Sequence, residues 1–216
     1  MNSYNIRIRL VNPFNRGIAQ VANSNRPVIV AGGGIGGAAA ALALANAGFR
    51  VQLIERAPEF GVIGYGIQLG PNVFPMFDRL GISGSILRNA IVPNAVLMLD
   101  SVDAGVIARI PTGDSFLQRF RRPYIVIHRV DLHRALLDAC EANSAIELLP
   151  LTGAASYEIS SDRVRVRTDD GQVLDGAALI GADGLRSTVR AQMLTEGEPR
   201  MTGFVCLLYT SPSPRD

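Results

Sequence analysis

The sequence contains only two cysteines, Cys140 and Cys206, among its 216 residues. Two thiols can neither build a disulfide framework nor fill a four-ligand zinc site, and their scarcity favours a reducing compartment. No apolar run approaches the roughly 20 residues of a membrane span. Arginines and asparagines interrupt the N-terminus, where a secretory signal would be apolar. We therefore expect a cytoplasmic protein without a membrane partner.

An excess of one charge is also lacking, because 21 basic residues face 19 acidic ones and the net charge is +2. This balance argues against nucleic acid as a partner. Hydrophobic residues make up 48% of the chain and charged residues 19%, so burial can offset the entropy lost on ordering. Residues 1–26 are rich in asparagine and arginine without a sustained period, and we predict that they form a disordered or artefactual extension.

The first regular pattern is a β-α-β unit. Pro27–Ala31 is an apolar run typical of a strand buried on both faces. A helix of small residues is expected from about Gly36 to Ala47, with Gly48 ending it, and Val51–Glu55 is a second strand. Such a unit implies parallel strands with a right-handed crossover, and therefore an α/β fold.

The rest of the chain alternates strands, loops and helices. The pattern predicts a glycine-rich loop over Gly61–Gly70, a helix from Pro71 to near Gly81, and a helix capped by Asp131. Asp170 with Gly171 indicates a hairpin turn. Further strands are expected at Ala95–Leu99, Gly105–Ile110, Tyr124–Ile127, around Val164 and Val166, and at Ala177–Ala182, with Ser187 opening a short helix.

Gly32, Gly34 and Gly37 form a G-x-G-x-x-G motif between the first strand and the first helix. The glycines permit a tight turn, close approach of a pyrophosphate, and close packing of helix and strand. The phosphates would lie at the helix N-terminus, and Glu55 at the end of the second strand could accept the ribose hydroxyls. The alternative is a glycine-rich turn with a surface glutamate. The motif alone leaves NAD and FAD open.

A second cluster, Gly181–Arg190 (GADGLRSTVR), follows a buried strand and opens a helix. Asp183 could accept a hydroxyl or orient backbone N–H groups, and Arg190 could face a phosphate. The competing interpretation is a capped helix that binds nothing.

Other reactive side chains have simpler interpretations. His128 and His133 are the only histidines and lack the spacing of a helical metal pair, so no metal site is expected. We predict that His128 ends a strand, that His133 is exposed on the polar side of its helix, and that Cys140 lies in the core. The basic run at 119–122 is expected to be a solvated loop rather than a site for a substrate carboxylate.

Four segments together resemble the class A FAD-dependent aromatic monooxygenases. They are Val28–Arg56, Gly64–Asn72 (GYGIQLGPN), His128–His133 (HRVDLH) and Gly181–Arg190. The resemblance covers the N-terminal half of that family and implies a Rossmann-like FAD-binding domain over residues 27–205, with part of an inserted, mainly-β substrate domain (about 89–127 and 200–205). It ends near residue 205, so residues 206–216 are predicted to be a non-native tail on a truncated chain.

The resemblance also implies which residues meet FAD. Val62 and Tyr65 depart from it, because the family commonly has glutamate and alanine there, and Tyr65 is bulky in a loop close to the flavin. The family's candidate catalytic base lies beyond residue 216, so no catalytic residue is assigned. The FAD contacts implied are Gly32, Gly34, Ile35, Gly36, Gly37, Glu55, Arg56, Gly66, Ile67, Gln68, Arg129, Asp183, Gly184 and Arg190.

The activity implied is hydroxylation of a small phenolic acid. NADH or NADPH would reduce the flavin, O2 would form a flavin C4a-hydroperoxide, and one oxygen would pass to the ring. The stretch Tyr124–His133 favours members that hydroxylate 3-hydroxybenzoate, with salicylate hydroxylases as the alternative. Another FAD-dependent oxidoreductase, an NAD-dependent dehydrogenase and a non-catalytic flavin-binding fragment stay open. We expect the full-length protein to form a homodimer.

Overall fold

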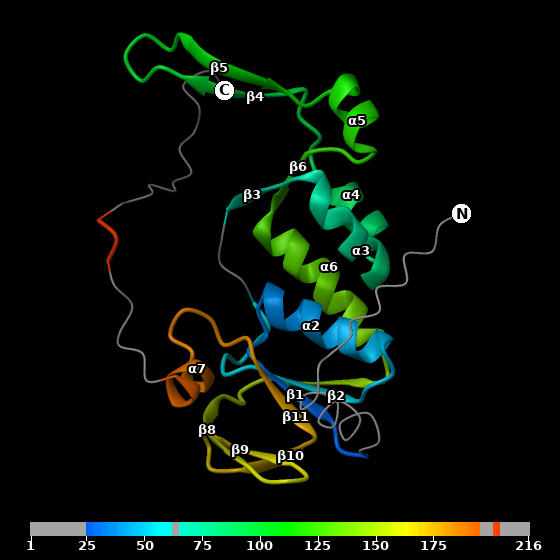
Figure 1. The fold of residues 1–216 in the computed structure, drawn as a ribbon, viewed down its shortest axis with the longest axis vertical. Coiled ribbons are helices and arrows are strands. Elements are labelled where there is room, and N and C mark those ends of the chain that lie inside the picture. Colours follow the sequence, from blue (N-terminus) through cyan, green and yellow to red (C-terminus); the bar gives the residue numbers. More distant parts are fainter. Residues whose placement is uncertain (1–24, 62–64, 195–200, 204–216) are drawn as a thin grey trace.

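The computed structural model describes residues 25–61, 65–194 and 201–203. Most of the predicted 1–26 extension, all of the 206–216 tail, and Val62 lie outside these ranges. Within them a four-stranded parallel sheet forms the centre, in the order β11-β1-β2-β7 (Figure 1). Its strands are β1 (Val28–Ala31), β2 (Val51–Ile54), β7 (Ile146–Leu149) and β11 (Ala178–Gly181).

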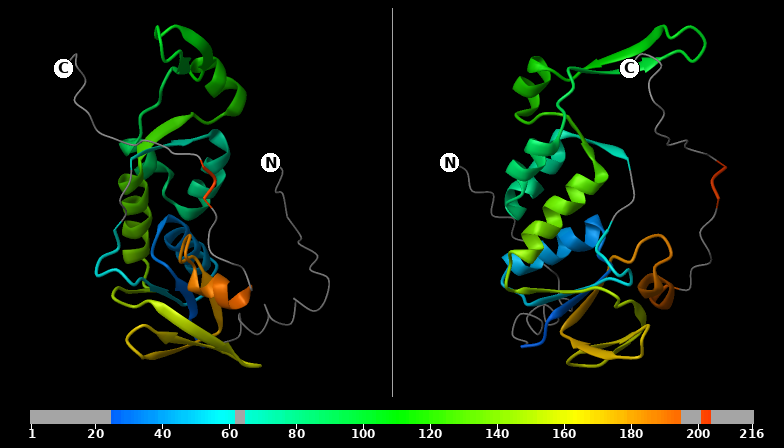
Figure 2. Two further views of the ribbon diagram at one scale, coloured as in Figure 1. Left: turned by 90° about the vertical axis from the view of Figure 1, so that its left-hand side faces the viewer. Right: turned by 180° about the vertical axis from the view of Figure 1, so that it is seen from behind.

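The parallel sheet is covered on both faces, so the described chain has three layers. Helices α2 (Ile35–Asn46) and α6 (Arg129–Glu141) lie on one face, and an antiparallel sheet lies on the other (Figures 1 and 2). The side chain of Val30 packs into the helix layer, whereas Ile29 packs against the antiparallel sheet. This explains why the whole of β1 is apolar and buried.

Small residues let α2 and α6 approach closely. Ala38, Ala41 and Leu42 of α2 are buried in the same cluster as Leu136 of α6. The thiol of Cys140 in α6 donates to the carbonyl of Ala38 at 3.4 Å, which confirms the core position predicted for this cysteine. The predicted β-α-β unit is confirmed, and Gly48 follows α2 with φ of +91°.

The antiparallel sheet has the order β10-β9-β8, and helix α7, which follows β11 in the chain, packs on β8. Its β9–β10 hairpin turns at Gly171, with φ of +84°, as predicted. The amide of Gln192 in α7 binds both backbone groups of Tyr157 in β8: the Tyr157 N–H donates to Oε1 (3.0 Å), and Nε2 donates to the Tyr157 carbonyl (2.6 Å). The elements are β8 (Ala154–Ile159), β9 (Val164–Thr168), β10 (Val173–Gly176) and α7 (Thr188–Met193).

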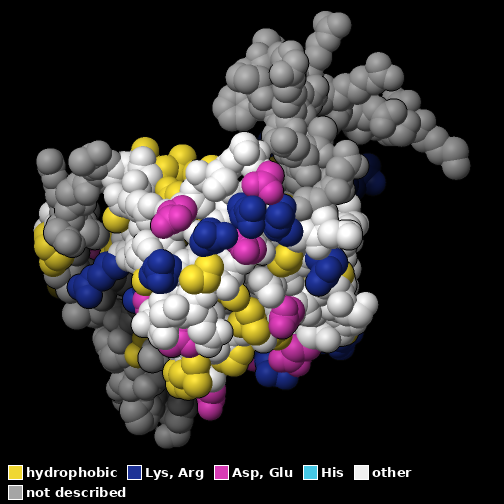
Figure 3. Space-filling model, turned by 90° about the horizontal axis from the view of Figure 1, so that it is seen from below, with side chains coloured by type: hydrophobic (Ala, Val, Ile, Leu, Met, Phe, Trp, Pro, Cys, Tyr) yellow, Lys and Arg dark blue, Asp and Glu magenta, His cyan; other side chains and the backbone are white. Residues whose placement is uncertain are grey.

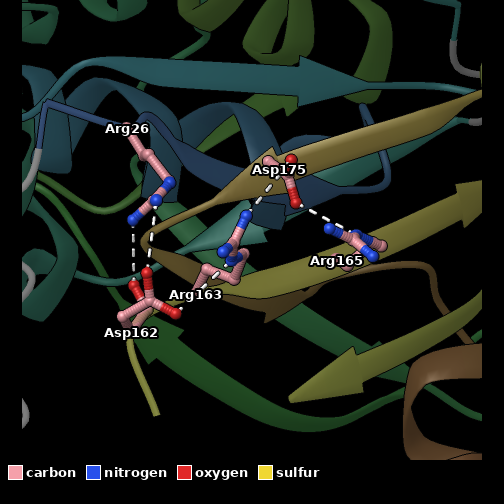
Figure 4. A network of polar contacts seen from close by, with 5 residues as sticks. All are labelled: Arg26, Asp162, Arg163, Arg165 and Asp175. Carbon is pink, nitrogen blue, oxygen red and sulfur yellow. Dashed lines mark hydrogen bonds and ion pairs between the residues drawn. The ribbon is translucent and has the colours of Figure 1, made fainter. Parts of the chain in front are cut away.

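Ion pairs lie on the outer face of this sheet, and one of them joins Arg26 to the distant Asp162 (Figure 4). Asp162 contacts Arg26 at 3.2 Å and Arg163 at 3.3 Å, and Asp175 contacts Arg165 at 3.2 Å and Arg163 at 3.9 Å. The face seen from below mixes basic and acidic side chains rather than gathering one charge (Figure 3). Exposed pairs of this kind contribute little individually.

The sequence predicted a loop over the whole glycine-rich stretch Gly61–Gly70, but part of this stretch is a strand. Gly66–Leu69 forms β3, which pairs antiparallel with β6 (Ile125–His128), so its hydrogen-bonding partner lies about 60 residues further on. The predicted helix after it begins as a 3-10 turn (Pro71–Val73), continues as α3 (Phe74–Leu80) and ends at Gly81, with φ of +75°. Helix α4 (Ser83–Asn89) follows.

A hairpin of β4 (Ala95–Leu99) and β5 (Val106–Pro111), with α5 (Asp114–Phe120), lies at the end of the molecule remote from the parallel sheet (Figures 1 and 2). Both strands are at or within one residue of their predicted positions. Many of their apolar side chains are exposed, with Met98 and Ile107 each 61% accessible. None of the helices in the described ranges is long and apolar enough to cross a membrane.

Candidate functional site

The glycine loop after β1 needs its first glycine. Gly32 has φ of +105°, a conformation that side chains rarely adopt, and a Cβ there would lie 2.4 Å from the carbonyl oxygen of Ala182. Its N–H donates to the carbonyl of Ile54 at 2.9 Å, which fixes the loop to the end of β2. The loop is therefore held between the carboxyl ends of three adjacent strands, β11, β1 and β2.

The N-terminus of α2 is open. Gly34 caps it without any side-chain hydrogen bond, and its first turn contains no acidic residue. A Cβ on Gly34 or Gly36 would meet nothing within 4 Å. Uncapped N–H groups at a helix N-terminus carry partial positive charge and suit an anionic group such as a phosphate.

Glu55 lies directly after β2, beside this helix terminus. Its Oε2 accepts the N–H of Gly33 at 2.7 Å and its Oε1 accepts the N–H of Ala57 at 2.9 Å. An ionised carboxylate offers about four acceptor positions. Glu55 can therefore support the loop and still accept ribose hydroxyls, so the two interpretations of this residue are compatible.

A cavity of about 270 Å³ joins these groups to the second cluster. It is lined by Gly32 and Gly34, by Glu55 and Arg56, and by Asp183 and Gly184. Thr152, Gly153 and Arg186 also line it and were missed from the sequence. The first two follow β7, so recognising that strand would have placed them at the same sheet edge.

A larger cavity, of about 410 Å³, lies between β8, β9, β11 and α7. Its walls include Ile159, Val164 and Leu179 but none of the residues predicted to form the site. Size alone would favour this cavity. We assign the site to the smaller one, because ligands of open parallel sheets bind at the carboxyl ends of the strands, where polar groups converge.

The second cluster is both a helix cap and a wall of the site. Asp183 accepts the hydroxyl of Ser187 at 2.5 Å and the N–H of Val189 at 3.2 Å, and Ser187 caps α7 by accepting the N–H of Arg190 at 2.9 Å. The Arg190 guanidinium donates to the carbonyl of Leu185 at 2.6 Å, and Arg190 does not line the cavity that contains Glu55. Asp183 and Gly184 do line it.

The remaining predicted residues lie in β3 and at the start of α6. Gly66, Ile67 and Gln68 are in β3, where Gln68 accepts the hydroxyl of Tyr124 at 2.5 Å. Arg129 is the first residue of α6, and its N–H donates to the carbonyl of Tyr65 at 3.0 Å. None of these four lines the 270 Å³ cavity.

Two predictions on α6 are wrong. His133 is buried, with 2% of its surface accessible, and its Nε2 lies 2.6 Å from the carbonyl oxygen of Gly33. The helix is capped by His128, whose Nδ1 accepts the N–H of Val130 at 3.3 Å, whereas Asp131 lies within the first turn. His128 does end a strand, as predicted.

The basic run is only partly the solvated loop that the sequence predicted. Arg119 belongs to the last turn of α5. Arg122 pairs with Asp78 at 2.5 Å and lies over the ring of Phe74 at 5.7 Å. Among the described residues, no group of three or more histidine, cysteine or acidic side chains could hold a metal ion.

A model of the family described as FAD binding domain matches residues 25–214. A 3-hydroxybenzoate 6-hydroxylase from Polaromonas naphthalenivorans is 49% identical over 83% of this chain and 44% of its own length. The enzyme of the same name from Klebsiella oxytoca is 42% identical over 82% of this chain, again 44% of its own length. The chain thus spans less than half the length of these relatives.

Solved structures show the same fold. A 2-methyl-3-hydroxypyridine-5-carboxylic acid oxygenase superposes with a TM-score of 0.67 at 26% identity, covering 79% of this chain and 42% of the oxygenase. The flavin-dependent monooxygenase PieE, solved with FAD and substrate, gives 0.68 at 26% identity, covering 78% and 32%. These matches confirm the predicted α/β, Rossmann-like fold, and the open terminus of α2 fits a dinucleotide. The chain therefore belongs to the family described as FAD binding domain, and its cofactor is FAD.

Proposed function

We propose that the protein containing this chain hydroxylates a small phenolic acid, with 3-hydroxybenzoate as the first candidate. The observation that carries the proposal is the open, glycine-lined terminus of α2 beside Glu55, in a chain 40–49% identical to three proteins named for that hydroxylation. The assignment of roles to individual residues below is part of this proposal.

The glycine loop would hold the FAD pyrophosphate. The N–H groups of Gly34, Ile35 and Gly36 begin α2, and their partial positive charge would face the phosphate oxygens. Glu55 would accept the adenosine ribose hydroxyls, with Arg56 beside it at the cavity wall. Asp183 and Gly184 would close the opposite wall, with Arg190 supporting their loop through the Leu185 carbonyl.

The flavin end of the site would be formed by a different part of the chain. Gly66, Ile67, Gln68 and Arg129 would lie toward the isoalloxazine, and the β4–β5 hairpin would belong to the substrate domain. Bound FAD supplies the redox chemistry: reduction by NADH or NADPH, and activation of O2. This chain's residues orient the cofactor and exclude water, and we assign no proton-transfer residue among them.

The electronics of a phenol limit which ring carbons can be hydroxylated. A phenolate donates electron density to its ortho and para carbons, so the pocket must select one by orientation. Hydroxylation of 3-hydroxybenzoate para to its hydroxyl yields 2,5-dihydroxybenzoate. Salicylate, losing CO2 to give catechol, is the alternative. 6-Hydroxynicotinate is a third candidate, because a Bordetella bronchiseptica enzyme named for it is 35% identical to this chain.

The full-length protein should be tested with all three acids, following NADH and NADPH oxidation and identifying products by chromatography. We expect 2,5-dihydroxybenzoate from 3-hydroxybenzoate. Catechol from salicylate alone would reverse the choice of substrate, whereas hydrogen peroxide as the only product would exclude all three acids. Flavin spectra without any NAD(P)H oxidation would indicate a non-catalytic flavin-binding protein. Light scattering on the same sample would test the proposed homodimer.

A further inference from the structure

His133 connects α6 to the glycine loop, 100 residues earlier in the sequence. Its side chain is buried, and its Nε2 lies 2.6 Å from the carbonyl oxygen of Gly33. A carbonyl oxygen can only accept a hydrogen bond, so the contact requires the hydrogen on Nε2. His133 thus has a definite tautomer and a single backbone target.

The other side of Gly33 is held as well. Its N–H donates to Oε2 of Glu55 at 2.7 Å. A Cβ on Gly33 would lie 2.4 Å from a ring carbon of Phe60 and 3.0 Å from Cβ of Glu55, so no other residue fits there without displacing them. Both polar backbone groups of Gly33 are therefore fixed by side chains from outside the loop.

The geometry of the peptide bond carries this constraint one residue further. The described chain has no cis peptide bonds, so the Gly33 carbonyl and the Gly34 N–H point in opposite directions in one plane. Because His133 holds the carbonyl toward α6, the Gly34 N–H is directed away from α6. The carbonyl of Gly34 is already used by the N–H of Ala38 at 2.9 Å.

We propose that His133, as the neutral tautomer with its hydrogen on Nε2, is a positioning residue that orients the Gly34 N–H toward the FAD pyrophosphate. The inference rests on the proposed FAD site. His133 would act through the Gly33–Gly34 peptide and would not touch the cofactor. Its loss should lower FAD affinity and leave the turnover of fully FAD-loaded enzyme unchanged.

The first experiment measures FAD dissociation constants of the full-length protein by flavin fluorescence. His133→Leu fills the space but leaves the Gly33 carbonyl without a donor, and should weaken binding about tenfold. His133→Gln carries an amide N–H that can reach the Nε2 position and should recover most of the affinity. His133→Asn is too short to do so and should resemble His133→Leu.

Cys140→Ala is the matched control. Cys140 is also buried on α6 and also contacts a backbone carbonyl, that of Ala38 within α2, but it lies two helical turns beyond His133 on α6. It should lower thermal stability without changing FAD affinity. If His133→Leu fails to fold, the contrast between the Gln and Asn variants still decides the proposal.

The second experiment reads the tautomer without FAD. In long-range ¹H–¹⁵N spectra of the FAD-free protein labelled at histidine, the signals lost in His133→Gln should be those of an Nε2–H imidazole. An Nδ1–H tautomer, or equal FAD affinity in wild type and His133→Leu, would overturn the proposal. A wild-type protein that binds no FAD would instead contradict the proposed function, while the tautomer would still test the contact.

Discussion

Gly37 in the first turn of α2 packs directly on the carbonyl of Gly32, because a Cβ on Gly37 would lie 1.8 Å from that oxygen. The distance is far below any real contact, so the helix can begin here only if residue 37 is glycine. Gly36, the preceding residue, is exposed, and a Cβ on it would meet nothing within 4 Å.

Gly37→Ala should therefore destabilise the fold, by about 3 kcal/mol, because the helix must shift away from the strand. Gly36→Ala is the matched control and should raise stability by about 0.5–1 kcal/mol, since alanine loses less entropy in a helix. Urea unfolding of both variants measures the difference. Equal stabilities would show that the turn between β1 and α2 is not the one described.

Glu55→Ala should weaken FAD binding. It removes a charged acceptor of the Gly33 N–H and, in the proposed site, of the ribose hydroxyls, and such bonds contribute about 1.5–3 kcal/mol each. We expect a roughly tenfold to hundredfold loss of affinity, measured by flavin retention on dialysis and by titration. Glu59→Ala removes the same charge from an exposed position in the following loop and should bind FAD like wild type.

Cys140 should make stability fall at high pH. Burial, aided by the neighbouring Glu141 carboxylate, raises the pKa of the Cys140 thiol from 9.0 to about 11. Below pH 9 the thiol is protonated in both states. Between pH 9 and 11 the unfolded chain loses this proton while the folded chain keeps it, so the free energy of unfolding decreases as pH rises.

Cys140→Ala should lack this decrease. The stability difference between wild type and variant, from denaturant unfolding at pH 8.5 to 11, should shrink steadily with pH. A constant difference would mean that the thiol is less buried than described. The same burial predicts slow reaction of Cys140 with thiol reagents until the protein unfolds, because little thiolate is present.

The β4–β5 hairpin should make the 216-residue chain prone to associate. Met98, Val106, Ile107 and Ile110 are all more than half exposed, and exposed apolar side chains of this kind favour association. We expect binding of a hydrophobic dye and poor solubility. The double substitution Met98→Lys and Ile107→Lys should lower dye binding and raise solubility without altering FAD affinity. A wild-type chain that stays monodisperse at high concentration would contradict this expectation.

The sequence predicted the β-α-β unit well because its signals are local. The positions of Gly32, Gly37 and Glu55 in this unit follow from local spacing, whereas β3 depends on pairing with β6 far along the chain. Strands β7 and β8 were not predicted, since short apolar runs such as Ile146–Leu149 fit a helix as well as a strand.

His133 was misplaced for a different reason. Polarity suggested an exposed position, but His133, Leu137 and Cys140 share one stripe of α6 at helical spacing, and all three are buried. That spacing was visible in the sequence, but the prediction gave more weight to the polarity of histidine. Asp183 is a milder case, because its cap on α7 and its place in the cavity wall proved compatible.

Gln192 has a consequence for how this chain meets others. By accepting from the N–H and donating to the carbonyl of Tyr157, its amide occupies two of the backbone groups that an added strand would use on β8. β8 is the outermost strand of its sheet. A side chain thus takes the position of a neighbouring backbone and hinders pairing of the β8 edge with a strand of a second molecule.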